Sequence, residues 1–259
     1  MRCIDLSADL GESFGDYTIG NDEALLPLLT SANVACGFHA GDPRVLDRTV
    51  RACAERGVEI GAHPGFHDLV GFGRRPISMS TEEVATDTLY QIGALAAFAR
   101  KHGRTLQHIT PHGSLGNLCV ADPAYARGVL DAVEAFDPTL PVVTQAGVLA
   151  DLAHERGIPV AITAMADRAY NTDGSLVSRK LPGAVIHDPG LMVERVLRMV
   201  LEGTVEAIDG TVIDLDCHTV LIHGDSPEAL EVADRIRTEL VAHGVTLAPI
   251  PTVLSTRKG

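Results

Sequence analysis

Tryptophan is absent from this 259-residue sequence, and aromatic residues make up only 4% of it. A core must therefore be built from Ala, Val, Leu and Ile, and the 46% hydrophobic content is sufficient for one. No apolar run reaches the roughly 18 residues that a membrane-spanning helix needs, and no signal-peptide pattern follows Met1. We therefore expect a cytoplasmic protein that does not enter a membrane.

Basic residues are also scarce, since 21 Lys and Arg stand against 34 Asp and Glu and give a formal net charge of -13. Nucleic acids and anionic membranes bind basic patches, so neither is the expected partner. The five cysteines are odd in number and form no CxxC pair, which favours reduced thiols. The GxGxxG and P-loop glycine motifs are absent as well, which disfavours a classical nucleotide-binding fold.

Short apolar runs alternate with polar loops and helix-like segments along the whole chain. The expected strands lie at 34–36, 58–62, 106–109, 142–143, 160–162, 220–222 and 245–248. The expected helices lie at 42–56, 80–103, 148–156, 188–201 and 226–244, with another that begins at Asp122. This alternation predicts a parallel sheet with right-handed crossovers. About seven units without a linker predict a single α/β-barrel domain over 1–259, with a doubly wound open sheet as the alternative.

Polar clusters, most of them with a histidine, follow the expected strands. They lie at 5–12, 36–43, 62–65, 111–113 and 222–225. The carboxyl ends of the strands of an α/β barrel meet on one face, where active sites are built. A lone histidine is more often structural, but several at equivalent positions favour acid–base chemistry or metal ligation. The sequence therefore predicts an enzyme with one pocket at this face.

Carboxyl groups are concentrated near the first strand. Even spacing places Asp5, Ser7 and Asp9 on one side of a strand. Burying Asp5, Asp9 and Glu12 together is costly without a cation, a ligand or shared protons. A functional role is favoured for Asp9 and Glu12, whereas a solvated loop is an equal alternative for Asp5.

Two further segments offer side chains to the expected pocket. His39 has no local structural task, whereas Asp42 is expected to cap the helix that Pro43 begins. Arg74 and Arg75, on a glycine-containing loop, could clamp a carboxylate or phosphate, or could form surface salt bridges.

Asp167 and Arg168 could form an ion pair that closes the pocket, at the start of an excursion over 168–181. The remaining histidines are expected at the surface or in packing roles: His67, His102, His108, His154, His187, His218 and His243. Asp and His from several strand ends could form a two-His, one-carboxylate metal site, although no tight ligand spacing such as HExxH supports one.

Several long motifs resemble the LamB/YcsF family, which contains one component of the bacterial ATP-dependent 5-oxoprolinases, the A subunit. The matching stretches are 5–15 (DLSADLGESFG), 30–43 (TSANVACGFHAGDP), 61–75 (GAHPGFHDLVGFGRR), 90–95 (YQIGAL), 166–170 (ADRAY), 182–188 (PGAVIHD) and 223–227 (HGDSP). The resemblance implies an irregular seven-stranded (β/α) barrel akin to polysaccharide deacetylases. It also implies ATP-driven hydrolysis of 5-oxoproline, or a related lactam, to glutamate, with partner subunits B and C that resemble an allophanate-hydrolase pair.

The implied reaction needs a base, donors for a developing oxyanion and a cation near the substrate carboxylate. Because a lactam amide is a poor electrophile, phosphorylation of its oxygen makes attack by water feasible. The residues that could supply the catalytic roles are Asp9, His39, His63 and His112. Those expected to bind the substrate are Glu12, Arg74, Arg75, Asp167, Arg168, His223 and Asp225.

Three positions depart from the family pattern. The family motif KPHGALYN is TPHGSLGN here, so that Thr110 replaces lysine and Gly116 replaces tyrosine. Thr163 stands where the family has a glutamate. We hypothesise that an inward Lys–Glu pair has been lost as a unit, which is less costly than stranding one charge. The alternatives are therefore a metal-dependent deacetylase-like hydrolase that works without ATP, or a non-catalytic binding protein of the same complex. A homo-oligomer is compatible with the sequence.

Overall fold

Seven parallel strands form a closed barrel in the computed structural model, which describes residues 2–224 and 229–257. In order around the barrel they are β1 (Cys3–Leu10), β2 (Ser31–Ala35), β3 (Glu59–His63), β4 (Leu106–Ile109), β5 (Val142–Thr144), β6 (Val160–Met165) and β9 (Thr219–Ile222). Pairing of β9 with both β6 and β1 closes the ring. The short strand β10 (Thr246–Leu247) adds to the beginning of β1. The predicted irregular seven-stranded barrel is therefore confirmed, and the open sheet is excluded.

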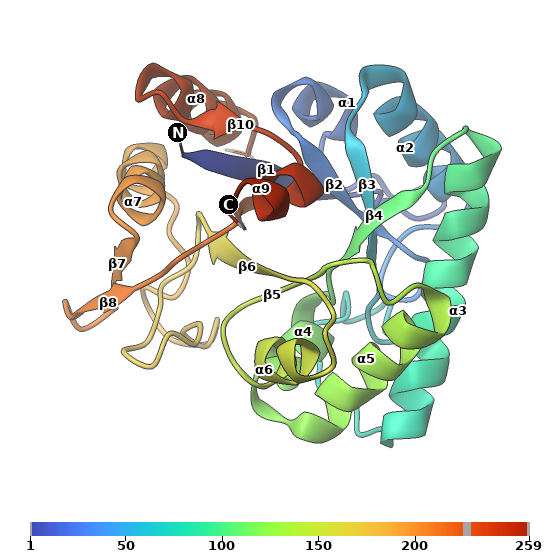
Figure 1. Ribbon diagram of the computed structural model, residues 1–259. Coiled ribbons are helices and arrows are strands. Elements are labelled where there is room, and N and C mark those ends of the chain that lie inside the picture. Colours follow the sequence, from blue (N-terminus) through green and yellow to red (C-terminus); the bar gives the residue numbers. More distant parts are fainter. Residues whose placement is uncertain (1, 225–228, 258–259) are drawn as a thin grey trace.

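Helices surround the strands (Figure 1). They are α1 (Asp22–Leu25), η1 (Leu26–Leu28), α2 (Pro43–Arg56), α3 (Thr81–Lys101), α4 (Gly113–Ala121), α5 (Pro123–Phe136), α6 (Val148–Glu155), α7 (Pro189–Leu201), α8 (Ala229–Ala242) and α9 (Ile250–Arg257). The expected caps form, because Asp42 accepts from the first turn of α2 and Ser80 forms a capping box with Glu83. Within the described residues, none of the helices combines the length and the apolar composition needed to cross a membrane.

Several elements were not expected from the sequence. They are α1, η1, α4, α9 and the hairpin of β7 (Thr204–Glu206) with β8 (Val212–Asp214). Helix α4 contains two glycines, which are poor helix formers, and it is supported by packing against α5 and α6. The expected beginning of the last helix at Ser226–Pro227 lies outside the described residues.

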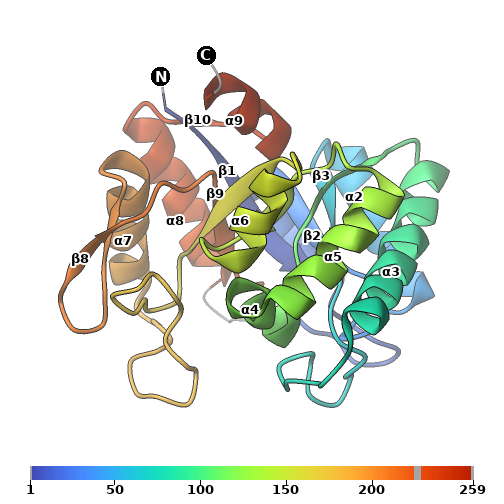
Figure 2. The same cartoon turned by 60° about the horizontal axis from the view of Figure 1, so that its bottom comes forward.

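The two ends of the barrel differ. At the end where the strands begin, Ile250 and Leu254 of α9 pack on Val143 and Ala161 and cover the opening. Figure 2 shows the loop between β3 and α3 and the excursion between β6 and α7 at the end opposite α9. The carboxyl ends of the strands therefore lie under these two long loops.

The interior of the barrel is polar. Leu6, Ala8 and Leu10 belong to the apolar core shared with the helices, whereas the alternate residues of β1 face inward. The buried carboxylate of Asp5 accepts hydrogen bonds from Thr30 Oγ1 at 2.6 Å, Ser31 Oγ at 2.6 Å and Thr219 Oγ1 at 2.5 Å. Burial outweighs these bonds and raises the pKa of Asp5 to about 6. Asp5 is thus part of the barrel interior and does not lie in a solvated loop.

We predict that Asp5→Asn removes a specific pH dependence of stability. Because the pKa of Asp5 is raised from 3.8 to about 6 in the folded protein, folding binds a proton between these pH values. The contribution of Asp5 to the free energy of unfolding therefore falls by about 2 kcal/mol as the pH rises from 4 to 7. Chemical denaturation of Asp5→Asn should lack this fall, whereas the exposed Asp16→Asn should keep it. Parallel curves for wild type and Asp5→Asn would contradict the prediction.

Candidate functional site

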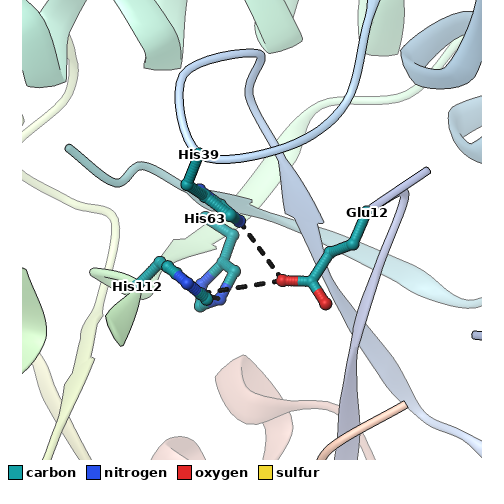
Figure 3. A group of neighbouring side chains, drawn as sticks. All are labelled: Glu12, His39, His63 and His112. Carbon is teal, nitrogen blue, oxygen red and sulfur yellow. Dashed lines mark hydrogen bonds and ion pairs between the residues drawn. The ribbon is translucent and has the colours of Figure 1, made fainter. Parts of the chain in front are cut away.

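Four buried side chains converge at the carboxyl end of the barrel (Figure 3). Glu12 and His39 follow β1 and β2, His63 ends β3, and His112 caps α4 directly after β4. One carboxylate or imidazole ligand atom from each of the four lies within 4.8 Å of the others. The predicted convergence of the strand-end clusters is therefore observed for these four residues, which could together hold a metal ion.

Glycines make room for the rings. The imidazoles of His39 and His112 stack with centroids 3.7 Å apart and planes at 3°. A Cβ on Gly73 would lie 2.7 Å from His39 Cβ and 2.8 Å from His112 Cδ2, and a Cβ on Gly65 would lie 2.6 Å from His39 Nδ1. The side-chain amide of Gln91 holds Gly65 by bonds to both its N–H and its carbonyl. The stacked pair thus depends on the absence of side chains around it.

Backbone carbonyls orient two of the rings. His63 Nδ1 lies 2.6 Å from the carbonyl oxygen of Thr110, and His112 Nε2 lies 2.8 Å from that of Phe72. Phe72 has a φ of 54°, an uncommon value for a non-glycine residue, and its carbonyl is bound by the ring of His112. The remaining nitrogens, His63 Nε2 and His112 Nδ1, lie 2.9 Å apart.

A hydrogen-bonded relay holds Asp9 beside this group. Asn33 Nδ2 donates to Asp9 Oδ1 at 2.9 Å, and Asp9 Oδ1 lies 3.4 Å from His63 Nε2. The side-chain oxygen of Asn33, Oδ1, accepts a hydrogen bond from His108 Nε2 at 2.7 Å and another from Thr110 Oγ1 at 3.2 Å. Burial opposes ionisation of Asp9, but the neighbouring imidazoles, His63 first, outweigh it and hold the pKa of Asp9 well below its usual range.

Sequence reasoning missed Asn33 and misjudged the location of His108. Asn33, on β2, is the register partner of Asp9. His108, on β4, lies two residues before Thr110, so both side chains point to the same side. Strand periodicity could have placed both inside the barrel once Asp9 was placed there. Gly61 leaves space for the ring of His108, since a Cβ at Gly61 would lie 2.0 Å from His108 Nε2.

The stacked imidazoles are neutral. Burial, followed by the neighbouring His63 and Arg74, holds the pKa of His39 well below its usual value. Burial, followed by His39 and His63, does the same for the pKa of His112. Both rings therefore offer lone pairs rather than positive charge at neutral pH.

A second pair, His223 and Asp167, lies at the same end of the barrel. His223 Nδ1 lies 2.8 Å and 2.9 Å from the two carboxylate oxygens of Asp167, and Arg179 NH2 lies 3.5 Å from His223 Nε2. Burial opposes a charged ring, but Asp167 and then Asp9 outweigh it and raise the pKa of His223. The expected partner of Asp167, Arg168, instead donates to carbonyls of the excursion, so the predicted Asp167–Arg168 ion pair is replaced by Asp167–His223.

The arginines that were predicted to bind the substrate make different contacts from one another. Arg75 forms an ion pair with Asp68 inside its own loop, and Arg74 stacks 4.8 Å above the ring of Phe72. Arg168 donates to Ala184 O at 3.2 Å and to Val177 O at 2.5 Å and so fastens the excursion. Asp225 lies outside the described residues.

The two threonines that depart from the family pattern, Thr110 and Thr163, lie inside the barrel. Thr110 donates to Asn33, whereas Thr163 Oγ1 is buried without a hydrogen-bond partner among the residues described. The interior thus accommodates both hydroxyls without a buried ionic group at either position.

Comparisons with known proteins agree over almost the whole chain. The LamB/YcsF family model matches residues 4–255. The 5-oxoprolinase A subunit of Natranaerobius thermophilus is 48% identical over 253 residues, covering 97% of this chain and 98% of that protein. The corresponding protein of Mycobacterium avium is 51% identical over 248 residues, covering 95% and 98%.

Two solved structures illustrate what this chain is similar to, one in sequence and fold and the other in fold alone. A lactam utilization protein from Thermus thermophilus superposes with a TM-score of 0.90 at 46% identity, over 96% of this chain and 99% of the other. The T48 deacetylase superposes with a TM-score of 0.51 at 16% identity, over 98% and 92%. The second likeness shows a shared barrel fold alone.

We predict that Gly73→Ala disrupts the stacked histidines. The new Cβ would overlap both rings at a residue with φ +61°, which costs about 1–2 kcal/mol in backbone strain alone. Thermal unfolding should show destabilisation, and the imidazole NMR signals should shift. The matched control is Gly93→Ala in α3, where a Cβ meets nothing within 4 Å and should stabilise the helix by about 0.5–1 kcal/mol. Unchanged imidazole signals in Gly73→Ala would refute the role of this glycine.

Proposed function

The chain belongs to the LamB/YcsF family, and we propose that it is the A subunit of an ATP-dependent 5-oxoprolinase. Its reaction is hydrolysis of the lactam amide of 5-oxoproline to glutamate. The names of its relatives and the fold it shares with a lactam utilization protein support this proposal. The observation that carries it in the site is that an ionised carboxylate, Asp9, and a protonation-prone imidazole, His223, occupy one barrel mouth.

Opening an amide requires one group that accepts a proton and another that donates one, both at the same site. Groups whose environments push their pKa values apart serve as base and acid. Asp9 orients the attacking water and accepts its proton. A carboxylate with a lowered pKa is a weak base, which suffices once phosphorylation has made the lactam carbon strongly electrophilic. His223, held by Asp167, donates a proton to the lactam nitrogen as the C–N bond breaks. The acyl phosphate that remains is hydrolysed by a second water to glutamate and inorganic phosphate.

The other side chains hold the substrate. His39, His63 and His112 gather beside Asp9 and line the place at which the lactam binds. Glu12 orients His39 through the 3.2 Å contact with its Nε2. Arg74, which is near enough to affect the pKa of His39, is the best-placed cation for the substrate carboxylate among the predicted arginines.

ATP enters the reaction through partner subunits. The names of the relatives describe each as one lettered component of a 5-oxoprolinase, which implies a complex with other subunits. We assign phosphorylation of the lactam oxygen to subunits B and C, which are expected to resemble an allophanate-hydrolase pair. The present chain then receives the activated lactam at the barrel mouth.

The decisive experiment measures glutamate released from 5-oxoproline with ATP, by the chain alone and with purified subunits B and C. We expect turnover only in the mixture. Turnover by the chain without ATP would favour the deacetylase-like alternative. No turnover with B and C that are active beside a relative of this chain would refute the proposal and favour a non-catalytic binding role.

We predict that Asp167→Asn lowers kcat of the complex by about 10²–10⁴-fold, the usual contribution of general acid–base catalysis. Since Asp167 raises the pKa of His223, its loss should also move the alkaline limb of the kcat profile to lower pH. The matched control is Asp173→Asn, in the same excursion but bonded to Ser175. A reduced kcat with an unshifted profile would show a structural role instead.

A further inference from the structure

Two carbonyl groups determine which nitrogens of His63 and His112 carry hydrogen. A carbonyl oxygen only accepts, so His63 Nδ1 donates to Thr110 O and His112 Nε2 donates to Phe72 O. In a neutral imidazole the other nitrogen is then an acceptor. The structure therefore aims two lone pairs at each other across the 2.9 Å between His63 Nε2 and His112 Nδ1. Two acceptors at this distance repel unless a cation lies beside them.

Glu12 brings an anionic oxygen to the same point. Its Oε1 lies 3.2 Å from His39 Nε2 and 3.6 Å from His112 Nδ1 (Figure 3). The longer separation exceeds that of a hydrogen bond, so Glu12 and His112 are not joined by a proton. Ligands of a tetrahedral ion with bonds of about 2.0 Å lie about 3.3 Å apart, and the three measured separations fall around this value.

From these contacts we propose that Glu12 Oε1, His63 Nε2 and His112 Nδ1, with His39 Nε2 as a fourth and weaker donor, bind one divalent cation of the zinc type. Imidazole nitrogens with a single carboxylate suit Zn²⁺ or Co²⁺, whereas Mg²⁺ and Ca²⁺ prefer oxygen ligands. This proposal stands on the donor set alone and does not depend on the lactam reaction.

The three histidine rings differ in the hydrogen-bond partners of their second nitrogens. Metal-binding histidines usually donate their second nitrogen to a carbonyl or carboxylate, which orients the ring. His63 and His112 meet this condition, whereas His39 Nδ1 is buried without a hydrogen-bond partner among the described residues. His39 is therefore the most weakly oriented ligand, and its loss should cost the least affinity.

The two carboxylates add a reason for a dication. Asp9 and Glu12 are only 5% and 4% exposed, so that both charges are largely removed from water. Asp9 Oδ1 is 3.4 Å from His63 Nε2 and remains bonded to Asn33. A proton shared by His63 and His112 would relieve their contact alone, whereas an ion with charge +2 would also attract the oxygens of Glu12 and Asp9.

The test is a titration of the chelator-treated full chain with Co²⁺, followed by visible absorption, and displacement by Zn²⁺. We expect one ion per chain, d–d bands of a four- or five-coordinate site, a raised Tm and recovery of the same stoichiometry by elemental analysis. Absence of saturable binding by wild type, or the bands of a six-coordinate aqueous ion, would overturn the proposal and leave a shared proton as the occupant. This outcome is independent of the glutamate assay.

Two substitutions remove a ligand but keep its supporting bond. His63→Asn retains an amide near Nδ1 to donate to Thr110, and His112→Gln retains one near Nε2 to donate to Phe72. Each should weaken Co²⁺ binding by more than about 100-fold, beyond the usual cost of losing a supporting group. His39→Gln should weaken it less.

The matched control is His108→Gln, an equally buried histidine whose Nε2 donates to Asn33 and faces no second lone pair. It should bind Co²⁺ with wild-type stoichiometry. Near-ultraviolet circular dichroism verifies that each variant folds. If folded His63→Asn and His112→Gln keep wild-type affinity, these residues are not ligands and the proposal is wrong.

Discussion

The burial of charge inside a closed barrel is the constraint on which the rest of the structure depends. Barrel interiors are commonly filled by branched apolar side chains, whereas here Asp5 and Asp9 of β1 point inward. Each is satisfied by neighbouring strands, Asp5 by hydroxyl groups and Asp9 by the amide of Asn33. Because Asp5 takes partners from both β2 and β9, its full set of hydrogen bonds forms only when the ring has closed. The same requirement ties the active end to the integrity of the whole barrel.

The histidines at the mouth depend on what is missing around them. Gly65 and Gly73 leave space for His39 and His112, and Gly61 leaves space for His108. The imidazole rings can therefore pack directly against the glycine backbone, a close contact that any larger residue at these positions would prevent. The carbonyls of Thr110 and Phe72 then select the ring nitrogens that face inward. The packing around these imidazoles, and not only the residue type, therefore determines which ring nitrogens carry hydrogen and which offer a lone pair.

The mouth contains two functional groups with different electrostatics. The stacked imidazoles are neutral and electron-donating, whereas His223 is biased toward the protonated form by Asp167. Arg168 keeps the excursion in place through its carbonyl contacts, so the loop beside Asp167 is fastened from within. A site with lone-pair donors on one side and a proton donor on the other is suited to opening an amide, which needs attack at carbon and protonation of nitrogen.

The sequence by itself determined the alternation of parallel strands and helices, most helix boundaries and the strand-end positions of the cluster. Its patterns left an open sheet as an alternative, and closure into a barrel is decided by the pairing of β9 with both β6 and β1. These features follow from local rules, namely alternation, capping at Asp42 and Ser80, and the common edge formed by parallel strands. Helices α4 and α9 were beyond those rules. Helix α4 contains two glycines, and α9 packs on Val143 and Ala161, which lie far away in the chain. The tertiary structure alone decided that Asp167 pairs with His223, that Arg168 binds carbonyls, and that Asn33 orients Asp9. Partner choice depends on which strands become neighbours when the ring closes, and residue types and spacing do not specify side-chain distances.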